Sequence, residues 1–219
     1  MGLLIAALKR KGGSCSSTMC ANLATTWAKA GHTVRLMDCD PQRSLIAWAH
    51  MSEGEGMLSE LVAEVATEQG TEFAAMLAEA RDRYDRVIVD CAPGFDPLAI
   101  QAASVADVVV IPCRPSTLDV MAAADALEVA KLGTRGREGA RVYFSPQANL
   151  PQTRMGRELP GHLADLGKEC GATVLPSVSA RIITAESPSS GLTCCEVEPD
   201  GPAAKEYAAV VEAIDAGNT

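Results

Sequence analysis

The feature that most constrains the fold is a short apolar segment followed by a glycine-containing turn and a helix. Residues 3–8 are all apolar and have the length of a buried parallel strand. Residues 19–31 have the composition of a helix that ends at a glycine. Between them lies a polar stretch with Gly12 and Gly13 near its middle. A strand, a glycine turn and a helix in this order direct backbone N–H groups toward a phosphate.

The turn departs from the usual phosphate-binding loop at its cationic position. A working loop reads G-x-x-x-x-G-K-[ST]. Arg10 stands at the first glycine of this pattern, and Cys15 stands at the last. Ser16 replaces the lysine, whereas Ser17 keeps the hydroxyl group. The loop alone leaves two interpretations open: a phosphate site without its lysine, or a tight turn that binds no ligand.

Further apolar runs predict more strands of the same sheet. They lie at 34–38, 84–90, 106–112 and 141–144 and alternate with helical stretches. This pattern predicts an α/β fold with a mostly parallel, twisted sheet and helices on both faces. Right-handed crossovers place the carboxyl ends of such strands at one edge, where ligands bind. We therefore expect Asp38, Asp40 and Asp90 to lie beside the glycine turn.

Length and composition predict one globular domain. A chain of 219 residues with 47% hydrophobic residues can bury a large core. Trp27 and Trp48 fall at helical positions, and we expect both in that core. Residues 52–56 and 133–139 are rich in glycine and charged residues and should form surface loops. A signal peptide and a membrane-spanning run are not expected, because neither pattern occurs in the sequence.

The ordered set of motifs resembles the ParA/MinD group of dimeric ATPases. That group has a deviant loop, K-G-G-x-G-K-[ST]-[ST], whose first lysine is an additional signature residue. Lys11 and the two glycines after it match the beginning of this loop, and Ser17 and Thr18 match its end. The D-x-D-P-Q motif of the group matches at 38–42, and its aspartate, small residue and Pro-Gly match at 90–94. Further matches at 114–119, 190–192 and 201–207 extend the resemblance over nearly the whole chain.

The resemblance implies a fold, a ligand and a set of partners. The fold is a single P-loop NTPase-like domain over residues 1–219, and no separate N-terminal DNA-binding domain is expected. The ligand is ATP or ADP with Mg²⁺. The partners are a second copy of the chain in a homodimer, an adaptor protein of the ParB type and nonspecifically bound DNA. The protein is expected in the cytoplasm, where it could associate with the nucleoid. No membrane partner is expected, because the acidic segment 206–215 lacks the basic face of MinD-type relatives.

The resemblance also assigns roles to single residues. Backbone N–H groups would surround the phosphates at Gly12, Gly13, Ser14, Cys15, Ser16, Ser17 and Thr18. The Ser17 hydroxyl would bind Mg²⁺, with Asp90 behind it through water. Asp40 would position the attacking water, and Lys11 would reach the phosphates of the partner subunit. Two of these roles have an alternative without a ligand: Asp90 as a structural turn residue and Lys11 as a solvated side chain. Asp38, the first residue of the D-x-D-P-Q motif, is expected to cap a turn, because the catalytic position of the group falls on Asp40.

The absent lysine predicts weakened nucleotide chemistry. A charge-assisted hydrogen bond contributes about 1.5–3 kcal/mol, which is roughly 10- to 150-fold in affinity. Hydrolysis should lose more, on the order of 100- to 1000-fold, because the lysine stabilises charge in the transition state. Cys15 adds a side chain where the backbone is expected at positive φ. Lys9 or Arg10 could replace the cation, although no feature of the sequence selects either.

The base-binding segment departs from the family as well. Members of the group usually follow the fifth strand with Asn or Thr-Arg near the adenine. Here Ser145 and Pro146 stand at this place, and Gln147 and Asn149 are the remaining candidates. Two departures at one site indicate altered or relaxed nucleotide chemistry.

Eight cysteines form a further unusual feature. Four of them, Cys15, Cys39, Cys91 and Cys113, follow predicted strands at the same edge. One interpretation is a soft-metal, iron–sulfur or redox site. The other is that cysteine serves as a small buried residue, which the lack of any C-x-x-C spacing favours.

The net charge of −9 argues against a generic nucleic-acid surface. A local basic patch of the ParA type would use Arg154, Arg157, Lys168 and Arg181, although these residues also suit a solvated helix face.

Three functions remain possible from the sequence: a ParA-like partition or positioning protein that works as a dimeric switch, a non-hydrolysing scaffold, and a thiol or metal protein. The retained Lys11, Asp40 and Asp90 favour the first, with ATP turnover in doubt.

Overall fold

One parallel sheet of seven strands forms the centre of the protein in the computed structural model, which describes residues 1–65 and 70–217. The strand order is β3-β2-β4-β1-β5-β6-β7, and every neighbouring pair is parallel. This arrangement confirms the predicted α/β sheet. The strands are β1 (Leu3–Ala7), β2 (Val34–Asp38), β3 (Val62–Glu64), β4 (Arg86–Asp90), β5 (Val108–Cys113), β6 (Arg141–Pro146) and β7 (Thr173–Val174).

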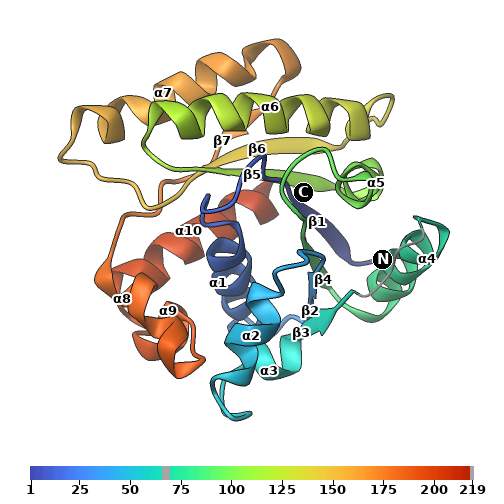
Figure 1. Cartoon of the computed structure of the whole chain (residues 1–219), viewed down its shortest axis with the longest axis vertical. Helices are drawn as coiled ribbons and strands as arrows, with labels where there is room; N and C mark the ends of the chain where they lie inside the picture. Colours follow the sequence, from blue (N-terminus) through green and yellow to red (C-terminus); the bar gives the residue numbers. More distant parts are fainter. Residues whose placement is uncertain (66–69, 218–219) are drawn as a thin grey trace.

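Helices cover both faces of this sheet (Figure 1). Within the part of the chain that the structure describes, no helix combines the length and the apolar character required to cross a bilayer. The α-helices are α1 (Ser16–Lys29), α2 (Ser44–His50), α3 (Leu58–Leu61), α4 (Gly70–Arg83), α5 (Pro97–Val105), α6 (Thr117–Thr134), α7 (Arg154–Gly167), α8 (Ile182–Glu186), α9 (Cys194–Val197) and α10 (Pro202–Ala216), and two 3₁₀ helices are η1 (Lys168–Cys170) and η2 (Ser187–Ser190).

The apolar run at the start of the chain contributes side chains to the cores on both faces of the sheet. Successive side chains of a strand point to opposite sides. Leu3 and Ile5 therefore pack in the core under α1 and α10, whereas Leu4 and Ala6 pack in the core under α4, α5, α6 and α7. Since β1 lies at the middle of the sheet, the loop that follows it emerges between β4 and β5 at the carboxyl edge.

Two predicted boundaries are wrong in detail. Helix α1 begins at Ser16 and not near Met19, so it starts directly after the glycine turn. The loop predicted at 133–139 begins later, because α6 continues through Gly133 and Thr134. Gly133 suits this helix because a Cβ there would lie 2.4 Å from the Cβ of Ala103 in α5. The glycine allows close helix packing and does not mark a turn.

Candidate functional site

The glycine turn after β1 has the backbone geometry of an anion-binding loop. Gly13 has φ +77°, and Cys15, the residue before α1, has φ 65° and ψ 21°. The left-handed region suits glycine, and an L-residue there costs roughly 1–2 kcal/mol. The prediction that Cys15 occupies a backbone position suited to glycine is confirmed.

A cavity of about 550 Å³ opens against this loop. Pockets for small molecules and cofactors usually measure about 300–1,000 Å³. Asp40 and Trp48 face the loop across the cavity, and Trp48 Nε1 donates to Leu192 O at 3.1 Å. The expectation of Trp48 as a core residue is therefore incomplete, because this buried indole is also a cavity wall. The loop lines the cavity with Lys9, Gly12, Gly13, Ser14, Cys15, Ser16, Ser17 and Thr18.

Hydrogen-bonding groups at the loop are open to an anion. The Ser14 hydroxyl is buried and has no hydrogen-bond partner among residues 1–65 and 70–217. Helix α1 begins without a side-chain cap from the described residues, so its first N–H groups are directed at the cavity. A helix N-terminus also carries partial positive charge. These observations fit a phosphate group at this position.

Asp90 is the centre of the polar cluster behind the loop. It lies at the end of β4 and is completely buried. Ser16 Oγ donates to Asp90 Oδ1 at 2.6 Å, and Ser17 Oγ donates to Asp90 Oδ2 at 2.5 Å. A hydroxyl beside a carboxylate supplies the hard oxygen ligands that Mg²⁺ prefers. Ser17 and Asp90 therefore fit the magnesium position that the motif predicts.

Lys9 brings a positive charge into this cluster. Its Nζ lies 2.9 Å from Asp40 Oδ2 and 3.1 Å from Asp90 Oδ1, and its side chain is almost completely buried. Burial alone would lower the pKa of Lys9, but the charges of Asp90 and Asp40 outweigh it and hold the pKa above its usual range. Lys9 is therefore an ammonium ion at every physiological pH. Of the two cations expected as possible substitutes for the motif lysine, Lys9 lines the cavity and Arg10 pairs with Asp125 at 3.5 Å.

The aspartate that ends β2 and the aspartate two residues later make different contacts. Asp38 accepts hydrogen bonds from the N–H groups of Leu45 at 3.0 Å and Ile46 at 3.3 Å, so it caps the start of α2. Burial raises the pKa of Asp38. Asp40 faces the cavity and binds Lys9 and the N–H of Gln42. Burial would raise the pKa of Asp40, but these two donors outweigh it and lower the pKa. The capping interpretation of Asp38 is confirmed.

Lys11 lies on the other side of the loop, toward α6. Its half-exposed ammonium is 3.2 Å from Asp119 Oδ1, in the first turn of α6. Asp119 is buried and also binds the Ser116 hydroxyl, which caps that helix. The side chain of Lys11 is thus directed away from the cavity of its own chain.

A second cavity, of about 270 Å³, lies next to the loop. Gln147, Arg181 and Tyr207 line it together with Cys15 and Thr18. The Gln147 amide is held by Ser145 Oγ at 2.9 Å and by the Tyr207 hydroxyl at 3.3 Å. Of the two predicted base-binding candidates, Gln147 therefore lies at a cavity beside the loop.

Asn149, the other base-binding candidate, hydrogen-bonds to the backbone of its own chain. Its side-chain oxygen accepts the N–H of Leu150 at 2.9 Å, and its backbone N–H donates to Val178 O at 2.8 Å. The side chain is buried. These contacts hold the segment after β6 against the strand-like residues near Val178.

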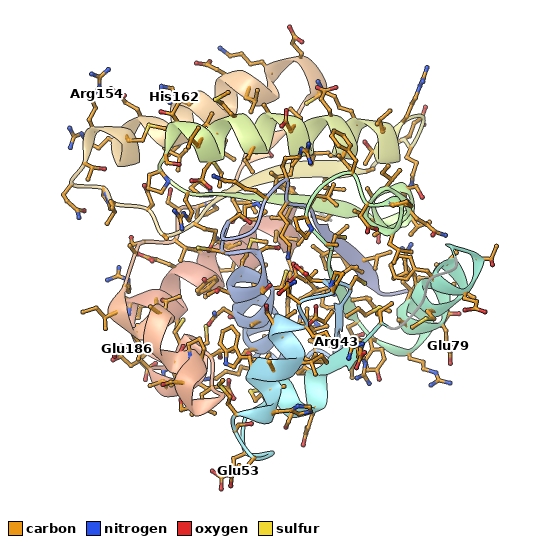
Figure 2. The ribbon with its side chains drawn as sticks, viewed as in Figure 1. Arg43, Glu53, Glu79, Arg154, His162 and Glu186 are labelled. Atoms are coloured by element: carbon orange, nitrogen blue, oxygen red, sulfur yellow. The ribbon has the colours of Figure 1, made fainter. Side chains whose placement is uncertain are left out.

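The basic residues predicted for DNA binding are not gathered in one patch. Arg154 begins α7, pairs with Glu158 at 2.9 Å and points away from the rest of the molecule (Figure 2). Lys168 lies beyond the other end of α7 and pairs with Asp165 at 2.7 Å. Arg157 donates to Gln152 O, and Arg181 pairs with Glu206 beside the second cavity. Each of these cations has an acidic or carbonyl partner on its own chain.

The cysteines are free thiols, and all eight lie within the described ranges. Burial raises the pKa of Cys15, and it raises the pKa of Cys39 and Cys113 to about 12. Metal binding and redox chemistry require the thiolate. No three His, Cys, Asp or Glu side chains in residues 1–65 and 70–217 are placed to hold a metal ion. Five cysteines are small buried residues (Cys20, Cys91, Cys113, Cys194 and Cys195), whereas Cys15, Cys39 and Cys170 are partly exposed.

Comparison with known proteins places this site in context. Residues 5–218 match the family described as the CobQ/CobB/MinD/ParA nucleotide binding domain. The chain is 25% identical to the chromosome-partitioning ATPase Soj of Thermus thermophilus, over 96% of this chain and 94% of Soj. It is 26% identical to the maintenance of carboxysome distribution protein A of Halothiobacillus neapolitanus, over 74% of each chain.

Solved structures share the fold. An ATP complex of a McdA variant from Cyanothece superposes with a TM-score of 0.72 at 17% identity, covering 98% of this chain and 96% of that chain. The septum site-determining protein MinD from Pyrococcus horikoshii, complexed with Mg-ADP, gives a TM-score of 0.75 at 15% identity, with the same coverage. At these identities the likeness shows the fold alone.

Proposed function

Because the chain belongs to the CobQ/CobB/MinD/ParA nucleotide-binding family, we propose that it is a ParA-like partition or positioning protein that binds ATP and ADP with Mg²⁺ and acts as a dimeric switch with weakened binding or hydrolysis. The observation that carries this proposal is the open loop. Among residues 1–65 and 70–217, the buried Ser14 hydroxyl has no hydrogen-bond partner and the start of α1 has no side-chain cap, and both lie against a cavity of about 550 Å³. An anionic ligand would satisfy both.

The residues of the site have separable tasks in this proposal. The loop N–H groups and Ser14 hold the phosphates. Ser17 binds Mg²⁺, which neutralises charge on the phosphate oxygens, and Asp90 supports it. Asp40 orients the attacking water from the far side of the cavity, where its pKa, lowered by Gln42 and Lys9, keeps it ionised.

Turnover is expected to be slow. Ser16 stands where the motif has its lysine, and its hydroxyl is bound to Asp90 and carries no charge. Loss of one donor to the developing charge costs on the order of 100- to 1000-fold in rate. Slow hydrolysis would lengthen the lifetime of the ATP-bound state.

The surface around Lys11 supports a dimer at this edge. Three large apolar side chains are exposed there: Phe95, Leu118 and Met121. Leu118 precedes the residue that pairs with Lys11, and Phe95 stacks under Arg10 at 4.7 Å. Exposed apolar side chains that cluster mark interaction surfaces. In the proposed dimer Lys11 leaves Asp119 and reaches the phosphates of the partner subunit.

The proposed cellular role follows from the relatives. Soj is a chromosome-partitioning ATPase, and the Halothiobacillus relative maintains carboxysome distribution. We assign this chain to cargo or DNA positioning in the cytoplasm, with an adaptor protein of the ParB type and nonspecific DNA at the nucleoid as partners. Arg154, Arg157, Lys168 and Arg181 stay the candidates for the DNA contact.

A second candidate function is a non-hydrolysing scaffold. The observation that favours it is the pair of departures in the loop, Cys15 in a strained left-handed conformation and Ser16 without a charge. Such a protein would keep the fold and the partner surface, and nucleotide would not change its oligomeric state.

Calorimetry separates the two candidates. Purified protein is titrated with ATP and with ADP in the presence of Mg²⁺, and light scattering follows the mass in the same samples. Micromolar binding with an ATP-dependent shift to dimer supports the switch. No binding up to millimolar nucleotide would reject it in favour of the scaffold. The double variant Cys15→Gly with Ser16→Lys should gain strong binding and hydrolysis if the site lacks only its cation.

A further inference from the structure

Lys9 and the two serines of the loop converge on one carboxylate, that of Asp90. Lys9 follows β1, whereas Ser16 and Ser17 begin α1. Lys9 Nζ and Ser16 Oγ both approach Asp90 Oδ1, at 3.1 Å and 2.6 Å. The ammonium is thus a neighbour of the side chain that replaces the motif lysine. Lys9, which follows β1, therefore places its ammonium beside position 16, where the motif has a lysine at the start of α1.

Among residues 1–65 and 70–217, the Lys9 ammonium has ion-pair partners for two of its three donors. An ammonium carries three N–H donors, and Asp40 and Asp90 take two of them. Lys9 also lines the cavity, next to the unpartnered hydroxyl of Ser14. A phosphate oxygen that accepts from Ser14 would therefore also meet a positive charge.

The two other cations of the loop, Arg10 and Lys11, form ion pairs with residues of α6. Arg10 stacks on Phe95 and lies 3.5 Å from Asp125 of α6. Lys11 pairs with Asp119, also of α6. Both side chains leave the loop on the α6 side. Lys9 alone among the three lines the cavity, as far as residues 1–65 and 70–217 are concerned.

We propose that Lys9 is the phosphate-binding cation of this protein, donating to the phosphate chain of a nucleoside di- or triphosphate in place of a lysine at position 16. This inference rests on the proposed nucleotide binding. The two buried carboxylates hold the ammonium in position before the ligand enters, so no side chain has to be ordered on binding. They also share its charge, so Lys9 contributes less affinity than an unpaired lysine would.

Affinity measurements on four proteins test the inference. The ligands are Mg-ADP and inorganic pyrophosphate, which report phosphate binding without turnover. Lys9→Ala should weaken both by about 10-fold or more. The double variant Lys9→Ala with Ser16→Lys moves the cation to the helix and should restore the affinity. Arg10→Ala, which removes a cation from the same loop outside the cavity, should leave the affinity unchanged.

The fold of the variants is controlled separately. Lys9→Ala leaves Asp40 and Asp90 buried without their cation, which destabilises proteins strongly. Lys9→Ala is therefore also made in an Asp40→Asn background and compared with Asp40→Asn alone. A loss of pyrophosphate affinity in that pair, with equal unfolding temperatures, supports the inference.

Two results overturn it, and they are distinguishable. If the wild-type protein binds Mg-ADP and Lys9→Ala binds it equally well in both backgrounds, Lys9 is a structural cation and the proposed nucleotide function stands. If the wild-type protein binds neither ligand at millimolar concentration, the proposed function fails and the inference fails with it.

Discussion

Lys11 Nζ lies 3.2 Å from Asp119 Oδ1 within the same chain. Asp119 is buried in the first turn of α6, whereas Lys11 is half-exposed at the rim of the loop. The aspartate is thus a fixed partner and the lysine a movable one. In the proposed dimer, Lys11 must first leave this ion pair to reach the phosphates of the partner subunit, so we expect Asp119 to oppose dimer formation.

Replacing Asp119 by asparagine should favour the dimer. The change removes the charge that retains Lys11 and keeps the backbone N–H that Ser116 caps. Ion pairs of this exposure contribute about 0.2–1 kcal/mol, so the dissociation constant of the ATP-bound dimer should fall by roughly 1.4- to fivefold. Sedimentation equilibrium with Mg-ATP measures it. Asp125→Asn, which affects Arg10 and not Lys11, is the matched control. An equal effect of both variants would contradict the prediction.

Cys15→Gly should stabilise the free protein. Cys15 has φ 65°, which is strained for a residue with a Cβ. Glycine relieves the strain but adds entropy to the unfolded chain, so the net gain is about 0.5–1 kcal/mol. Urea denaturation measures the unfolding free energy. Cys15→Ala removes the thiol and keeps the Cβ, so it should bring no gain. A gain for alanine equal to that for glycine would show that the thiol and not the backbone is responsible.

The central strands could be predicted from the sequence because a parallel strand covered on both faces is an unbroken apolar run. Leu3 and Leu4 belong to different cores, yet both must be apolar. The edge strands β3 and β7 could not be predicted, because three and two residues carry no pattern. Gly133 was misread as part of a loop, since only the packed structure reveals its contact with Ala103.

Glu206 should stabilise the protein at neutral pH and not in acid. Burial would raise its pKa, but Arg181 and Ser179 outweigh it and lower the pKa below the usual value of 4.5. Its contribution is therefore complete above about pH 4.5 and is lost as the pH falls through the lowered pKa. Glu206→Gln should cost about 1 kcal/mol at pH 7 once solvent screening is allowed for. Urea denaturation of both proteins at several pH values should show the difference shrinking below pH 4.5. A difference independent of pH would contradict the assignment.

The buried thiols should resist alkylation. With a pKa of about 12, Cys39 and Cys113 each have about one thiol in 10,000 ionised at pH 8. Iodoacetamide followed by mass spectrometry should modify the partly exposed Cys170 first and leave Cys113 unmodified for hours. The same protein in urea should be modified at all eight cysteines, which provides the control. Rapid labelling of Cys113 in the native protein would revive the redox interpretation.

DNA binding, if it uses the basic residues of α7, should depend steeply on salt. Each lysine or arginine that contacts a phosphate contributes about one unit to the slope of log affinity against log salt. Arg154→Ala and Arg157→Ala should each lower the slope by about one unit and leave the fold intact, since exposed ion pairs stabilise little. Arg83→Ala is the control, because Arg83 forms a similar exposed pair with Glu79 on α4. Fluorescence anisotropy over a salt series measures the slope, and an equal effect of Arg83→Ala would argue against this surface.

The positions of Asp38, Asp40 and Asp90 beside the loop could be predicted, because parallel strands end at a common edge. The tasks that the motif assigns to Asp40, Asp90 and Ser17 stay predictions. The ion pairs of Lys9 were not predictable, because they depend on two carboxylates that are distant in sequence. The position of Trp48 at the cavity could have been predicted from one feature: it is an aromatic residue in the first helix after the D-x-D-P-Q motif, and that helix lines the cavity.

The three donors that converge on Asp90 have a consequence for the stability of the fold. Buried carboxylates that have no cation beside them destabilise the fold strongly, because their charge is not compensated. Here the chain carries its own counterion, covalently attached at Lys9. The two carboxylates are therefore neutralised from within the chain, so the fold around them does not depend on an added cation.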